Sequence, residues 1–143
     1  MPVVSIGEVM KAYAADAEID ARGRGTILDY SEASMESVDE ILEAIAAATP
    51  VPQQATTDDV LWLFSKKYGG YLGQVVIKLM GGRWELEDLP DGNNARVVLI
   101  CNDIRGFPLE KIYQRLTGDQ FAGVAGYCRA LRAILKNCRD ASE

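Results

Sequence analysis

The sequence predicts an α+β fold in which about five helices pack around a small antiparallel sheet of about three strands. Helical spacing of apolar residues recurs along most of the 143 residues, and only short segments show the pattern of strands. The expected order is helix, strand, two helices, two strands, two helices. Because no stretch reads as a long linker, residues 1–143 are expected to form a single domain.

The first predicted helix begins at Ser5, which has the capping-box spacing with Glu8. Its apolar positions recur at helical intervals, and the glycines of the segment 22–25 end it. Residues 26–30, Thr-Ile-Leu-Asp-Tyr, are expected to form a short strand.

A second helix is expected to follow a cap at Ser31 or Ser34. One side of it is apolar from Met35 to Ile45, and the opposite side carries an acidic stripe formed by Glu36, Asp39, Glu40 and Glu43. Pro50 and Pro52 then break the chain into a polar connector.

The third predicted helix begins at residues 56–59 and ends at Gly81-Gly82. Its expected core stripe is Val60, Phe64, Tyr68, Leu72, Val75 and Leu79. Glycine within a helix costs about 1 kcal/mol relative to alanine, so Gly69, Gly70 and Gly73 indicate close approach by another element. Gly69 and Gly73 are expected to share the packed face. A phosphate-binding loop is disfavoured because no Gly-Lys-Ser/Thr follows.

Two strands and two helices complete the expected order. Residues 83–87 alternate as in a half-buried strand, residues 90–94 read as a loop, and the apolar run 95–101 fits an interior strand. Phe107-Pro108 opens a short helix that Gly118 ends, and Asp119 caps the last helix.

Charge and composition narrow the function classes. Residues 1–60 hold three bases and 12 acids, a net charge of −9, while the remainder holds 12 bases and nine acids, a net charge of +3. The chain has no histidine, which removes the commonest general base and metal ligand, and we expect no catalytic residue, metal or cofactor. The three cysteines are expected to be buried free thiols. No apolar run suits a membrane helix or a signal peptide, so a cytoplasmic location is expected.

Two further groups of residues are candidates for binding. Arg129, Arg132, Lys136 and Arg139 form a basic stripe on the last helix. That stripe fits nucleic-acid phosphate, the acidic half of a second subunit, or acids of the first two helices, and the acidic pI makes nucleic acid the weakest of these readings. A small-ligand or enzymatic site between the hairpin and the glycine-bearing helix would use Asp29, Tyr71 and Asp103.

Four segments together resemble a family of small bacterial domains of uncharacterised function. They are LDYSEASMESVDEIL at 28–42, GGYLGQVVI at 69–77, GGRW at 81–84 and FPLEKIYQRL at 107–116. Gln74 stands where that family's motif has glutamate. The resemblance supports the fold, assigns no catalytic residue, and extends to the immunity and accessory proteins that accompany secreted toxins.

We therefore expect a non-enzymatic protein-binding domain, an immunity protein that neutralises a bacterial toxin by occluding a basic toxin domain. The expected partner-binding residues are Asp16, Asp20, Glu36, Asp39, Glu40 and Glu43. No nucleic acid or membrane partner is expected, and a homodimer stays open. The alternative function is a small-ligand-binding or enzymatic domain with a carboxylate-lined pocket.

Overall fold

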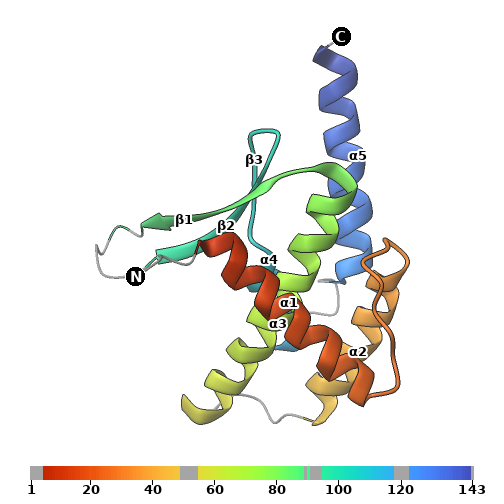
Figure 1. The fold of residues 1–143 in the computed structure, drawn as a ribbon, viewed down its shortest axis with the longest axis vertical. Coiled ribbons are helices and arrows are strands. Elements are labelled where there is room, and N and C mark those ends of the chain that lie inside the picture. Colours follow the sequence, from red (N-terminus) through yellow and green to blue (C-terminus); the bar gives the residue numbers. More distant parts are fainter. Residues whose placement is uncertain (1–4, 49–54, 89, 91–94, 118–122, 143) are drawn as a thin grey trace.

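The structure is a computed structural model that describes residues 5–48, 55–88, 90, 95–117 and 123–142. Five helices and one three-stranded sheet make up the described part, which confirms the α+β prediction (Figure 1). In chain order the elements are α1 (Ile6–Gly23), α2 (Ser34–Ala48), α3 (Ala55–Met80), β1 (Arg83–Asp88), β2 (Ala95–Cys101), β3 (Ile104–Gly106), α4 (Pro108–Leu116) and α5 (Val124–Ser142).

The sheet is antiparallel with the order β1-β2-β3, so β2 is its central strand. Trp84 of β1 lies opposite Leu99 of β2, and Leu99 lies opposite Gly106 of β3. The hairpin and the interior position of the 95–101 segment are therefore as predicted. Its loop at 90–94 lies almost wholly outside the described residues.

The strand expected at residues 26–30 is wrong, and β3 supplies the third strand instead. The Thr26 N–H bonds the Ala21 carbonyl and so completes the end of α1, while Ile27 is 82% exposed. Tyr30 has a φ of +63°, which an extended strand does not allow. The segment is a connector whose backbone is bonded to helices. β3 was not foreseen because three residues are too few to show a period.

The helix α3 lies at the centre of the molecule, with α1 crossing in front of it in Figure 1. It packs against α1, α4 and the sheet, and from Tyr68 to Val76 every side chain except Gln74 is buried. The predicted single core stripe is wrong at its ends, because Val60 and Leu79 are exposed. A helix surrounded by neighbours is buried all round in its middle and uncovered where the neighbours stop.

Close packing at the glycines of α3 is confirmed, but against three neighbours and not one. A Cβ atom on Gly69 would lie 2.9 Å from the Leu109 backbone in α4, and one on Gly70 would lie 2.8 Å from the Met10 carbonyl oxygen in α1. A Cβ atom on Gly73 would lie 2.1 Å from the indole ring of Trp84. The Trp84 Nε1–H donates to Gln74 Oε1 at 2.8 Å and fixes that ring.

The predicted helix ends agree with the structure where it describes them. Ser5 Oγ accepts the Glu8 N–H at 3.2 Å, and Gly81, with a φ of +81°, donates its N–H to the Ile77 carbonyl at 2.8 Å at the end of α3. Pro108 lies in the first turn of α4. Gly118 and Asp119 lie outside the described residues. No helix in the described ranges combines the length and apolar character needed to cross a bilayer.

Replacing Gly73 by leucine should destabilise the protein by about 1–3 kcal/mol, because the new side chain would displace the Trp84 ring from the core. Urea unfolding of the variant measures the change. Gly126→Ala on α5 is the matched control, since a Cβ there meets only Arg129 Nη2 at 4.0 Å. That control should gain up to about 1 kcal/mol. A Gly73→Leu variant with a higher unfolding midpoint would contradict the packing described here.

Candidate functional site

Three of the predicted partner-binding residues form a row on the outer face of α2. Glu36, Glu40 and Glu43 are exposed and are spaced by four and three residues, which places them on one side of the helix. The opposite side, from Met35 to Ile45, is buried. We call these three side chains the α2 acidic row. The structure shows that they are accessible.

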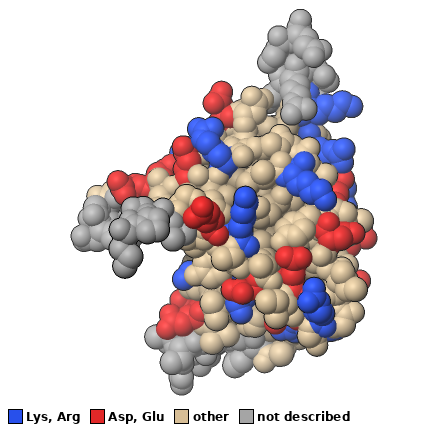
Figure 2. Space-filling view, in the orientation of Figure 1, with Lys and Arg blue, Asp and Glu red and all other residues tan. Residues whose placement is uncertain are grey.

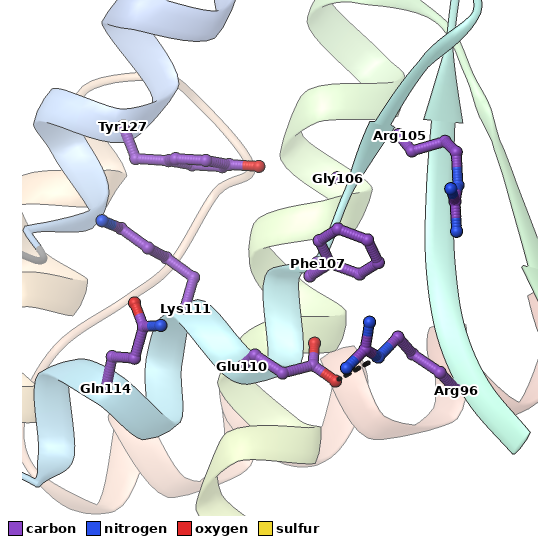
Figure 3. A pocket seen from close by; sticks show the side chains of 8 residues that line it. All are labelled: Arg96, Arg105, Gly106, Phe107, Glu110, Lys111, Gln114 and Tyr127. Atoms are coloured by element: carbon purple, nitrogen blue, oxygen red, sulfur yellow. Dashed lines mark ion pairs between the residues drawn. The ribbon is translucent and has the colours of Figure 1, made fainter. Parts of the chain in front are cut away.

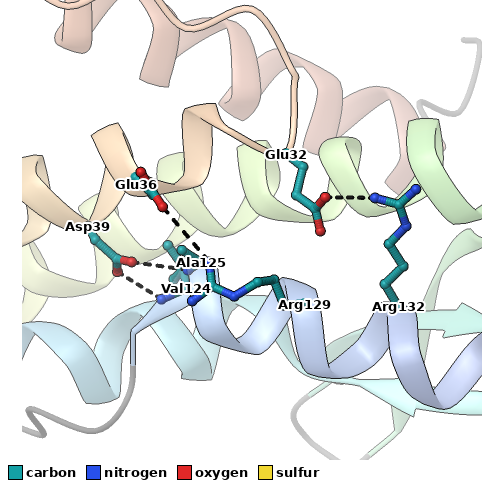
Figure 4. A network of polar contacts seen from close by, with 7 residues as sticks. All are labelled: Glu32, Glu36, Asp39, Val124, Ala125, Arg129 and Arg132. Atoms are coloured by element: carbon teal, nitrogen blue, oxygen red, sulfur yellow. Dashed lines mark hydrogen bonds and ion pairs between the residues drawn. The ribbon is translucent and has the colours of Figure 1, made fainter.

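Asp39 has a structural role, because it caps a different helix. Its Oδ1 accepts the Val124 N–H at 2.8 Å and its Oδ2 accepts the Ala125 N–H at 3.0 Å (Figure 4). Both donors belong to the first turn of α5, where backbone N–H groups lack helical partners and the helix dipole favours a negative charge. The carboxylate therefore joins α2 to α5. Sequence spacing cannot indicate a contact between residues so far apart.

Two bases of α5 pair with acids in α2 and in the turn just before it, as the intramolecular reading of the basic stripe expected. Arg132 lies 2.7 Å from Glu32, and Arg129 lies 3.9 Å from Glu36 (Figure 4). Both pairs are partly or largely exposed, so each is worth at most about 1 kcal/mol. The side chain of Arg139 lies outside the described residues. The pairing leaves the predicted acidic stripe partly neutralised at its Glu36 end.

The two acids predicted on α1 have different environments. Asp16 is exposed, and Ile19, three residues later, is 65% exposed on the same helix. Asp20 is half-buried, accepts a hydrogen bond from the Tyr68 hydroxyl and pairs with Arg24 at 2.9 Å. Asp16 is therefore accessible to a partner, whereas Asp20 is already held by two groups of its own chain.

The residues proposed for a carboxylate-lined pocket have three separate environments in the described structure. Tyr71 is fully buried, and its hydroxyl accepts the Tyr30 N–H at 2.8 Å. It also lies 2.7 Å from Ser34 Oγ, whose own proton is donated to a backbone carbonyl, so Tyr71 donates there. Asp29 is exposed, and Asp103 is exposed in the β2–β3 turn. None of the three lines either hollow described next.

A different pocket lies where β2, β3, α4 and α5 meet (Figure 3). Its volume is about 420 Å³, within the usual range for small-molecule sites. The side chains that give it its chemistry are Arg96, Arg105, Phe107, Glu110, Lys111 and Tyr127. We call it the basic pocket, because three bases line it against one acid. A second, more open hollow of about 730 Å³ adjoins it at Lys111 and Tyr127 and reaches Glu36 and Asp39.

The basic pocket is organised by aromatic rings. The Phe107 ring lies under two guanidinium groups, with its centroid 4.9 Å from Arg96 and 5.8 Å from Arg105. The Lys111 ammonium lies 5.4 Å from the Tyr127 ring centroid. Such cation–π contacts hold the charged groups in place with their hydrogen-bond donors still available. Sequence reasoning missed this site because its residues come from four elements. Arg96, the single charge in an otherwise apolar strand, was the one local signal.

Three groups in and near this pocket stay protonated at neutral pH. Burial raises the pKa of the Tyr127 hydroxyl, so it remains a hydrogen-bond donor. Burial also raises the pKa of the Cys101 and Cys128 thiols, which are free as predicted. Cys138 is outside the described side chains. Within the described ranges, no group of three or more acids and cysteines lies close enough to hold a metal ion.

Removing the Asp39 cap should weaken the attachment of α5. Asp39→Ala leaves two N–H groups of the first turn without a carboxylate, and we expect a loss of about 1–2 kcal/mol in the free energy of unfolding. Glu40→Ala, which changes the neighbouring exposed acid, is the matched control and should change stability by less than about 0.5 kcal/mol. Equal stability of Asp39→Ala and the wild type in urea would show that the cap contributes nothing.

Stability should fall as pH rises above about 10, the ordinary pKa of tyrosine. Burial, and then the hydrogen bond to Asp20, raise the pKa of Tyr68 in the folded state. The folded protein therefore keeps that proton while the unfolded chain releases it, so this contribution is complete below the unfolded pKa and is lost above it. Urea midpoints between about pH 8 and 11 measure the loss. In Tyr68→Phe the decline should be shallower, and a slope identical to the wild type would refute this origin.

Comparison of the chain with protein-family models, curated proteins and solved structures gives no match. Its function is therefore inferred from the charges and contacts of its own side chains.

Proposed function

We propose that this protein is a non-catalytic binding protein that recognises a basic protein surface through the α2 acidic row. The observation that carries the proposal is the row itself. Glu36, Glu40 and Glu43 project from one face of one helix, and among the described residues only Glu36 has an ion-pair partner, at 3.9 Å. Acids of one sign on a fixed helix attract a basic partner and orient it before contact.

The helix that bears the row is held rigidly, which favours binding without a large ordering cost. Its buried side includes Met35, Val38 and Leu42, each with no measurable exposure, and it packs against α4 and α5. Asp39 ties its middle to the first turn of α5. Preorganised charges lose little conformational entropy when a partner arrives, so more of the interaction energy appears as affinity.

The environments of the other polar candidates support binding over catalysis. Asp20 bonds Tyr68 and Arg24, Asp39 caps α5, and the Tyr71 hydroxyl joins the 30–34 connector to α3. Each of these groups is engaged in holding the fold, so none is poised beside another as an acid–base pair would be.

Charge alone rarely supplies affinity, so a contact of another kind has to accompany the row. Asp16 and the exposed Ile19 on α1 offer an acid beside an apolar side chain. Figure 2 shows acids and bases interspersed over the face it displays, so that face is not uniformly acidic. In the finer form of the proposal the partner is a bacterial toxin domain, and binding neutralises the toxin in the cytoplasm.

The test is copurification with the product of the neighbouring gene at low salt, followed by association kinetics. Reversing two charges of the row, Glu40→Lys with Glu43→Lys, should lower the association rate constant by about tenfold or more, and the loss should shrink as salt rises. The matched control is Asp88→Lys, a charge reversal at an exposed acid of β1. That control should leave the rate within about twofold of the wild type.

Three results decide between the parts of the proposal. Absence of a complex at low salt counts against a binding function with that partner. A complex whose association rate is unchanged by the α2 reversals moves the interface away from the row. Toxicity of the neighbouring product that the wild type relieves, and the double reversal does not, supports neutralisation.

A further inference from the structure

The basic pocket has a charge opposite to that of the chain as a whole. Arg96, Arg105 and Lys111 line it with a single acid, Glu110, whereas the full sequence has a net charge of −6. These residues come from β2, β3 and α4, so the fold itself gathers them. The positive charge of this pocket attracts small anions, although the protein as a whole is acidic.

The bases of this pocket are only partly neutralised by the protein. Arg96 and Glu110 are 3.8 Å apart, longer than a hydrogen bond. Arg105 pairs with Glu87, which is not part of the pocket lining, and both side chains are more than 40% exposed. Lys111 forms no ion pair among the described residues and rests on the Tyr127 ring. Exposed pairs of this kind exchange readily for a stronger anionic partner.

Two guanidinium groups share one aromatic ring, which brings like charges together. Both Arg96 and Arg105 lie within 6 Å of the Phe107 ring centroid. Figure 3 shows these arginines on the strand side of Phe107, with Lys111 and Tyr127 on the helix side. Like charges repel unless an anion lies between them, and the planar fork of arginine matches the oxygens of a phosphate. The pocket therefore suits an anion that accepts hydrogen bonds from both arginines.

A second, independent observation concerns Glu110. Its Oε2 atom is buried and has no hydrogen-bond partner in the described structure. Buried polar atoms are nearly always paired, so this oxygen is available to accept a hydrogen bond from a group that enters the pocket. The other oxygen of the same carboxylate faces Arg96. A ligand that brought an N–H or O–H group to Oε2 would complete this carboxylate.

We propose that the basic pocket binds a phosphate monoester that carries an N–H or O–H donor, with the phosphate held by Arg96 and Arg105 and the donor received by Glu110. Two guanidinium groups at one ring favour a phosphate monoester over a carboxylate, since a phosphate monoester carries about −1.5 to −2 at pH 7 and has enough oxygens to accept hydrogen bonds from both. Tyr127 adds a protonated hydroxyl from α5 (Figure 3). The site is separate from the α2 acidic row, so it stands whether or not that row binds a protein.

Isothermal titration of the full chain with adenosine 5′-monophosphate, inorganic phosphate and adenosine tests the ligand class. Saturable binding is expected for the nucleotide and, more weakly, for inorganic phosphate, with none for adenosine at the same concentrations. Adenosine binding as tightly as the nucleotide would overturn the role of the phosphate. Absence of saturation by either phosphate compound up to about 10 mM would overturn the site, since the weakest specific sites saturate in that range.

Variants then locate the site. Arg105→Gln and Arg96→Gln should each raise the dissociation constant of the nucleotide about tenfold, because each removes a charge-assisted contact. The matched control is Arg83→Gln, an exposed arginine paired with Glu85 outside the pocket, which should leave the constant unchanged. Equal losses in the control and the pocket variants would show non-specific attraction and refute the site. Arg105→Lys, which keeps the charge, should bind more tightly than Arg105→Gln.

Glu110→Gln separates the two halves of the ligand. Loss of the negative charge should tighten inorganic phosphate, while the advantage of the nucleotide over inorganic phosphate should shrink, because an amide is a weaker acceptor than a carboxylate. The variant changes one atom of the side chain, and its unfolding midpoint verifies that the fold is intact. An unchanged ratio of the two dissociation constants would overturn the assignment of the donor to Glu110.

Discussion

The absence of side chains at Gly69, Gly70 and Gly73 of α3 is the constraint on which the remainder of this structure depends. Three neighbours occupy the space where side chains would otherwise project, namely the backbone of α4, the backbone of α1 and the Trp84 ring. Interiors are packed so densely that even one added methyl group has to displace an atom already present. The absence of side chains at these glycines therefore sets how closely α1, α4 and the sheet approach α3.

The functional surfaces follow from that arrangement. Because α4 lies against Gly69 through Leu109, its Glu110 and Lys111 are free to face β2, β3 and α5 and to line the basic pocket. The helix α5 supplies the opposite wall through Tyr127, and Asp39 of α2 holds its first turn. A carboxylate in one helix thereby fixes the wall of a pocket that contains none of its own atoms.

Local patterns in the sequence predict the helices, their caps and the hairpin, but not the contacts between distant segments. Helix periodicity and caps such as Ser5 are encoded by near neighbours, so the helices and the β1–β2 hairpin were predictable. The connector at 26–30 has the composition of a strand. The hydrogen bond that holds it in another conformation joins Tyr30 to Tyr71, 41 residues away, and local patterns do not reveal such a bond. The α2 acidic row was visible as a stripe, yet the role of Asp39 depends on α5. The residues of the basic pocket come from four segments, and residue spacing along the chain does not predict which distant segments come together.

The glycines of α3 also bear on how the chain folds. A helix with three glycines in five positions has weak intrinsic helicity at its midpoint, since each forfeits about 1 kcal/mol relative to alanine. The segment therefore gains persistent helical structure only as α1 and α4 dock on it, while the cost of initiating a helix falls to the more favourable turns on either side. We therefore expect secondary and tertiary structure to form together at the centre of the molecule. The glycines of α3 thus couple the formation of this helix to its packing against α1 and α4.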